Sequence, residues 1–182
     1  MPDDFQQFKG LLGQQIALLH LSNFNQWTIA DEEAKVQGVD SRARLDIVAQ
    51  CTSNGFCPIE VKFQEYNFER YGVAFEHVLS ELGNGREVYA IDRSNNKLRL
   101  SNPTVYLWFP PSSRITDVPF YRDITVVTFE QVIQDLRSSL GNRFLETISS
   151  KVRGKVEAFF RTHGCSLTQN QRDNLAELFP NP

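Results

Sequence analysis

Hydrophobic and polar residues alternate along two short stretches in the first half of the chain. Residues 44–50 and 58–64 are rich in Val, Ile and Phe, with polar side chains between the apolar ones, and this pattern predicts two β-strands. Between them, Ser53-Asn54-Gly55 is typical of a tight turn, because Asn and Gly tolerate positive φ. We therefore expect the two stretches to pair as a hairpin.

Three charged side chains occupy alternate positions of this predicted hairpin. Side chains of a strand point alternately to its two faces, so Glu60 and Lys62 share one face, and Asp46 faces away from Leu45 and Ile47. If the apolar faces of the two strands coincide, the three charged groups converge. Two carboxylates and an ammonium are costly to gather there unless a ligand binds. A divalent cation is the obvious candidate, since Mg²⁺ prefers one or two carboxylates, waters and phosphate oxygens.

The rest of the chain alternates between helical and strand patterns. Apolar residues at three- and four-residue spacings predict helices over 3–21, 65–82, 142–161 and 166–179. Shorter apolar runs predict strands that open at 27–30 and cover 86–91, 98–100, 104–109 and 123–129. Thr128 is expected to cap a helix in a capping-box-like pattern with Gln131. This order predicts an α/β (α+β) fold with a mixed central sheet flanked by helices.

Length and composition indicate an ordinary globular protein. The chain has 182 residues, of which 41% are hydrophobic and 23% charged, which fits one domain with a small appendage. We expect an α/β core over residues 1–136 and a C-terminal helical extension over 137–182. The sequence lacks both an apolar run of about 20 residues, the length of a membrane span, and a basic leader at its acidic start. We therefore expect a cytoplasmic protein with no membrane partner.

Cysteine usage also favours a cytoplasmic protein. Three Cys cannot form a closed disulfide framework, which agrees with a reducing compartment. Cys51 and Cys57 flank the predicted turn and could face each other, but we favour their interpretation as two small, half-buried residues. A zinc site is not expected, because the His residues are scattered along the chain and no Cys-x-x-Cys pair exists.

Charge is unevenly distributed. The net charge of −3 does not indicate a nucleic-acid-binding protein. Basic residues nevertheless gather on the predicted helix 142–161, where Lys151, Arg153 and Lys155 form either a solvated face or a phosphate-contacting one. The acids at 31–33 are either a solvated edge or the source of one further acid for the cation site, preferably Glu33.

Asp46, a turn and then Glu60-Val61-Lys62 resemble the core of the PD-(D/E)xK nuclease superfamily, which includes restriction endonucleases and Holliday-junction resolvases. In that superfamily a metal-binding Asp lies on the second core strand, the (D/E)xK motif lies on the third, and a helix follows. The predicted order of elements agrees over roughly residues 5–92. Leu45 stands where a proline is usual, and the first helix has no glutamate. Gln64 is similar to polar residues that some members use near the metal or DNA.

The resemblance implies a restriction-endonuclease-like fold and a metal-dependent endonuclease that hydrolyses DNA, of the restriction, homing or junction-resolving type. Asp46 and Glu60 would hold Mg²⁺, for which Mn²⁺ can substitute, and Lys62 would complete the catalytic site. Double-stranded DNA and a second copy of the chain are the expected partners, since cutting two strands needs two sites. The alternatives are a catalytically inactive nucleic-acid-binding or assembly module, an RNA endonuclease, or three charges on the solvent face of a ribbon.

Overall fold

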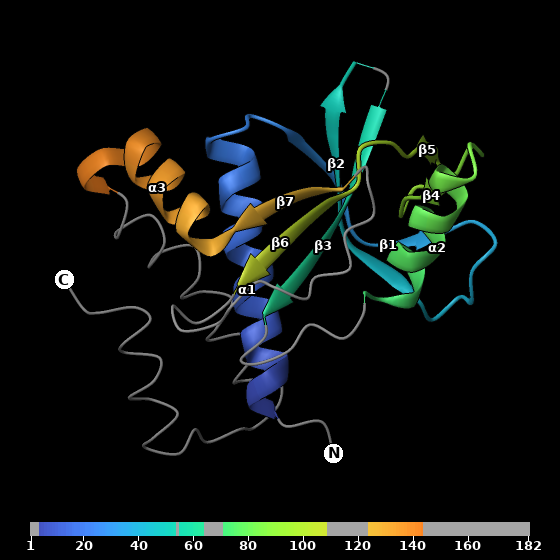
Figure 1. Cartoon of the computed structure of the whole chain (residues 1–182), viewed down its shortest axis with the longest axis horizontal. Helices are drawn as coiled ribbons and strands as arrows, with labels where there is room; N and C mark the ends of the chain where they lie inside the picture. The colour runs from blue at the N-terminus through green and yellow to red at the C-terminus, as the bar shows by residue number, and fades with distance from the viewer. Residues whose placement is uncertain (1–3, 54, 64–70, 109–123, 144–182) are drawn as a thin grey trace.

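The computed structural model describes residues 4–53, 55–63, 71–108 and 124–143 (Figure 1). The helices in these ranges are α1 (Asp4–Asn23), α2 (Val73–Gly83), α3 (Phe129–Leu140) and a final 3₁₀ turn, η1 (Gly141–Arg143). The strands are β1 (Thr28–Val36), β2 (Arg44–Thr52), β3 (Gly55–Phe63), β4 (Tyr89–Ile91), β5 (Lys97–Arg99), β6 (Thr104–Trp108) and β7 (Thr125–Thr128).

The described strands form one mixed sheet with the order β5-β4-β1-β2-β3-β6-β7. The pairs from β5 to β3 are antiparallel, whereas β3 with β6 and β6 with β7 are parallel. The hairpin of β2 and β3 lies at the centre of the sheet (Figure 1). The predicted mixed α/β architecture and the predicted hairpin are therefore both confirmed.

Helices cover both faces of this sheet. The apolar stripe of α1, including Leu12 and Ile16, packs with α3 against Ile47 and Ile59 on one face. On the other face, α2 buries an apolar stripe that includes Phe75 against β1, β2 and β6. Figure 1 shows α1 and α3 on one side of the central strands and α2 on the other. The hairpin is thus enclosed by two cores, which makes polar groups along it costly to desolvate.

Several element boundaries differ from those that the pattern predicts. The strand that opens near residue 27 runs to Val36 and includes the acids at 31–33. Helix α2 begins at Val73, and the two residues before it are not helical. The predicted N-terminal part of that helix, residues 65–70, lies outside the described residues. The predicted cap of α3 is confirmed, since the Thr128 hydroxyl accepts a hydrogen bond from Gln131 N at 3.4 Å.

The predicted C-terminal extension lies mostly outside the described residues, which end at 143. Helix α3 crosses the expected boundary between 136 and 137, while the predicted helix 166–179 and nearly all of helix 142–161 are not described. Among the described helices, none is both long and apolar enough to cross a membrane.

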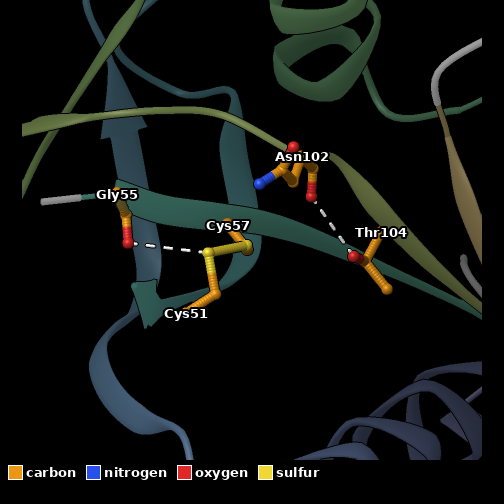
Figure 2. The surroundings of a disulfide bond; sticks show 5 residues. All are labelled: Cys51, Gly55, Cys57, Asn102 and Thr104. Carbon is orange, nitrogen blue, oxygen red and sulfur yellow. Dashed lines mark hydrogen bonds between the residues drawn. A yellow bond between two sulfur atoms is a disulfide. The ribbon is translucent and has the colours of Figure 1, made fainter. Parts of the chain in front are cut away.

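The two cysteines of the hairpin form a disulfide, which corrects the sequence-based interpretation of them as unpaired residues (Figure 2). The register between β2 and β3 shifts between Gln50 and Thr52. Such a bulge adds one residue to one strand, and Cys51 lies in it, 6.0 Å by Cα atoms from the fully buried Cys57 of the other strand. Cysteine usage therefore no longer indicates a reducing compartment.

Candidate functional site

Asp46 lies where β2 and β3 separate. The paired residues of the two strands run from Thr52 opposite Gly55 to Ile47 opposite Ile59, and Asp46 comes one residue beyond the last pair. The backbone N–H of Val61 donates a hydrogen bond of 2.7 Å to Oδ2 of Asp46. The carboxylate thus takes the place of a carbonyl partner in the ladder, which fixes it beside β3.

Glu60 and Lys62 meet at this same point from β3. The Glu60 side chain is almost fully buried, with the residue 2% exposed. Its Oε1 atom lies 2.7 Å from Nζ of Lys62 and accepts a second hydrogen bond, also 2.7 Å, from the backbone N–H of Gly72. Because residues two apart on a strand share a face, the Glu-x-Lys spacing itself produces this ion pair.

The structure brings the predicted catalytic residues Asp46, Glu60 and Lys62 within electrostatic reach of one another. Burial and then the charge of Glu60 raise the pKa of Asp46 from 3.8 to about 7. The hydrogen bond from Val61 and the charge of Lys62 act in the opposite direction but do not cancel this rise. One ammonium therefore faces two desolvated carboxylates, and the site favours an additional positive charge.

Glu33, the predicted further acid, lies on β1 across from Asp46. Its neighbours Glu32 and Ala34 pair with Ile47 and Leu45, so Glu33 stands opposite the residue between them. Its side chain is exposed, as the solvated-edge interpretation expects, yet its charge also raises the pKa of Asp46. Both interpretations of the acids at 31–33 therefore stay open for Glu33.

Asp31, another acid of that run, has a different role. It is 7% exposed, and its carboxylate lies 3.1 Å from Nε of Arg93 and accepts a hydrogen bond from the backbone N–H of the same residue. This ion pair, between a buried carboxylate and a largely exposed arginine, ties β1 to the turn that follows β4. Asp31 is therefore a structural residue at the margin of the site.

The strict alternation expected for β2 is wrong at Asp46. Leu45 packs in the core beneath α2, whereas Ile47 packs in the core beneath α1, although the two were expected to share a face. Leu45 lies beyond the last β2–β3 pair but is still paired with Ala34 of β1. Glu33, which precedes Ala34 in β1, has a positive φ of 62°. The alternation is therefore reset at Asp46, where the sheet is irregular.

Two residues beside the site were not singled out from the sequence. Gln14 of α1 donates a hydrogen bond of 3.0 Å from its side-chain amide to the backbone carbonyl of Asp46. Gly72, the residue directly before α2, donates a hydrogen bond from its backbone N–H to the carboxylate of Glu60. A glycine ahead of an apolar helical run is a signal for a helix N-cap, but the predicted helix 65–82 ran through it.

The remaining predicted site residues are not described by the structure. Gln64 follows β3 directly, and Lys151, Arg153 and Lys155 lie in the C-terminal part of the chain. Their roles beside the cation or on DNA stay predictions.

Asp46 and Glu60 are the predicted cation ligands that the structure describes. Within the described ranges no three His, Cys, Asp or Glu residues are assembled into a group that could hold a metal. Mg²⁺ is commonly bound by one or two carboxylates, with waters and substrate phosphates completing its shell, and Asp46 and Glu60 supply that number.

Comparison with protein-family models, with curated proteins and with solved structures gives no match. The function is therefore inferred from the residues of this site.

Proposed function

We propose that this chain is a Mg²⁺-dependent endonuclease of the PD-(D/E)xK type, with a restriction-endonuclease-like fold, that hydrolyses phosphodiester bonds of DNA. One observation carries the proposal. Asp46 and Glu60 come from adjacent strands, Glu60 is buried, and burial together with the charge of Glu60 raises the pKa of Asp46. A divalent cation would relieve that cost, and a phosphodiester brings the further oxygen ligands that Mg²⁺ prefers.

The burial of Glu60 argues against an ordinary solvent-exposed ribbon. Exposed ion pairs contribute roughly 0–1 kcal/mol and leave their groups hydrated, whereas Glu60 is only 2% exposed. Lys62 can neutralise one carboxylate, and Asp46 is then left with a raised pKa. Such perturbed groups are frequent at functional sites.

The order of elements also supports the proposal. The aspartate lies on the second strand of an antiparallel meander, the Glu-x-Lys motif lies on the third, and α2 follows. This is the order that the sequence resemblance implies for the superfamily. In addition, β2 departs from β3 at Asp46, and the Asp46 carboxylate reaches the backbone N–H of Val61 on β3.

Each residue then has a definite chemical task. Asp46 and Glu60 would hold the cation, and the hydrogen bond from the Val61 N–H fixes the orientation of the Asp46 carboxylate. A bound Mg²⁺ would polarise the scissile phosphate and lower the pKa of a coordinated water. Lys62 neutralises charge that develops on the phosphate oxygens, or positions the attacking water. A compact ammonium suits this task because it acts as a point charge with three rotatable donors.

A plasmid cleavage assay tests the proposal. Supercoiled DNA is incubated with the protein and Mg²⁺, or with EDTA, and nicked and linear products are resolved on a gel. Wild type should cut only with Mg²⁺, and Asp46→Asn, Glu60→Gln and Lys62→Met should each lower the rate by about a hundredfold or more. Asp40→Asn serves as the control, because Asp40 is exposed. Equal rates for the three site variants and wild type would refute the assignment.

The same assay separates the alternatives. Cutting of RNA but not of DNA would indicate an RNA endonuclease with the same site. Retarded migration of DNA without cutting would indicate a catalytically inactive binding module. Linear product that forms without a nicked intermediate would support a homodimer that cuts both strands in one encounter.

A further inference from the structure

Gly72 stands directly before α2 in a conformation that any residue can adopt. Its φ is −65° and its ψ is 150°, which lies in the extended region open to all L-amino acids. The backbone therefore does not require glycine at this position. The reason for a glycine has to come from its surroundings.

Those surroundings are the carboxylate of Glu60. A Cβ added to Gly72 would lie 2.9 Å from Oε1 and 3.5 Å from Oε2 of Glu60. The first distance is too short for a carbon atom beside an oxygen that already has other partners. The backbone N–H of Gly72 meanwhile donates to the same Oε1 atom at 2.7 Å. The Glu60 carboxylate thus lies against the Cα atom of Gly72, which has no side chain, and accepts a hydrogen bond from the N–H of the same residue.

Glu60 also has a second partner on the same carboxylate oxygen. Lys62 Nζ lies 2.7 Å from Oε1, and the residue is 2% exposed, so the carboxylate has no solvent to move into. A negative charge at the N-terminus of a helix is further favoured by the helix dipole. The carboxylate end of Glu60 is nevertheless the softest part of this contact, because the β3 backbone is paired with β6 at Glu60 and is held by the Asp46 carboxylate at Val61. A side chain at position 72 would therefore displace the carboxylate rather than the sheet.

We propose that Gly72 is a positioning residue for Glu60, and that its bare Cα and its N–H set where this carboxylate meets the cation. The inference rests on the proposed function and adds to it a link between the start of α2 and the metal site. Partners that orient a ligand typically change metal affinity by about 10–100-fold when they are lost. Gly72→Ala should therefore weaken cation binding while the fold is kept.

Mn²⁺ binding, followed by electron paramagnetic resonance, measures the effect. Gly72→Ala should lower the Mn²⁺ affinity of the full chain by about tenfold or more. The matched control is Gly83→Ala at the other end of α2, where an added Cβ meets nothing within 4 Å and should leave the affinity unchanged. Equal affinities for the two alanine variants would overturn the inference.

A double-mutant cycle separates displacement of the carboxylate from a general loss of structure. Glu60→Asp shortens the side chain by one methylene and makes room for a Cβ at position 72. In that background, Gly72→Ala should change Mn²⁺ affinity by less than about threefold, because the two sites are directly coupled. A loss as large as in the Glu60 background would mean that the alanine acts through the fold, and would refute the inference.

A third measurement needs no cation and keeps this inference separable from the proposed function. In the NMR spectrum of the cation-free protein, the Gly72 amide should shift when Glu60 is changed to Gln, because a charge-assisted hydrogen bond becomes a neutral one. The Gly83 amide should not move. If wild type binds no Mn²⁺, the proposed function fails, and the Gly72 shift alone then decides whether this residue positions Glu60. An unmoved Gly72 amide would refute the positioning itself.

Discussion

Asp46→Asn should make the cation-free protein more stable at neutral pH. The carboxyl of Asp46 has its pKa raised from 3.8 to about 7 by burial and by Glu60. The folded state therefore binds this proton more tightly than the unfolded state does. Between about pH 4 and pH 7 the free energy of unfolding of wild type falls as pH rises, and above pH 7 the full cost persists. Asparagine carries no charge and avoids that cost.

The size of the effect follows from the shift. Each unit of pKa corresponds to 1.36 kcal/mol, so a rise from 3.8 to about 7 corresponds to at most about 4 kcal/mol at pH 8. At pH 4 the wild-type carboxyl is protonated in the folded state, and the two proteins should differ little. The amide oxygen of asparagine can still accept the hydrogen bond from Val61 that Oδ2 accepts in wild type. The predicted gain in the free energy of unfolding therefore depends on pH and comes from removing the charge of Asp46.

Urea unfolding followed by tryptophan fluorescence, in EDTA at several pH values, measures this difference. Asp92→Asn is the matched control, because hydrogen bonds from Asn96 lower the pKa of Asp92. A lowered carboxyl pKa stabilises the fold above the unfolded pKa, and this contribution is lost as pH falls through the folded value. Asp92→Asn should thus destabilise the protein more at neutral than at acidic pH, the opposite trend to Asp46→Asn.

A lower stability of Asp46→Asn at pH 8, or an equal change at pH 4 and pH 8, would refute a cost that comes from the charge of Asp46. The first result would show that the ionised Asp46 stabilises the folded protein by more free energy than its desolvation costs. The second would show that its hydrogen bond to Val61, and not its charge, dominates.

Three further predictions concern other parts of the chain. Reduction of the disulfide, or Cys57→Ser, should lower the free energy of unfolding by about 2 kcal/mol in urea titrations, since the cross-link closes a short loop with a sequence separation of 6; equal midpoints with and without reductant would contradict it. His20→Ala should lower the free energy of unfolding by about 3 kcal/mol, because the buried imidazole of α1 lies 2.9 Å from Oδ2 of the buried Asp135 in α3, which then keeps its hydrogen bond from Gln131 on Oδ1 but loses its partner on Oδ2; thermal melts within 2 °C of wild type would argue against this. Charge reversal at Lys151 and Lys155 should weaken DNA binding and flatten its salt dependence, and an unaltered salt slope would remove them from the interface.

The central hairpin and the three charged residues on it could be predicted because they depend on local patterns. Alternation of apolar residues fixed both strands, and the spacing of Glu60 and Lys62 put them on one face. These features need no knowledge of distant parts of the chain.

The other features depend on where separate segments meet. The reset of alternation at Asp46 arises from the divergence of β2 and β3 and from the backbone of Glu33, and neither leaves a mark in the apolar pattern. The disulfide joins Cys57 to Cys51, which lies at a register shift of the hairpin, and the apolar pattern marks neither the shift nor the approach of the two side chains. Periodicity reports which face a residue occupies on a regular element, and it fails where the element becomes irregular.

A crystal of the protein soaked in Mn²⁺ would test the central claim most directly. We predict an anomalous peak at the place where β2 leaves β3, with carboxylate oxygens of both Asp46 and Glu60 as ligands at roughly 2.0–2.2 Å, the range for small hard divalent cations. The absence of a peak at saturating Mn²⁺, with Lys62 still on Oε1 of Glu60, would contradict a metal site there and the nuclease chemistry that depends on it.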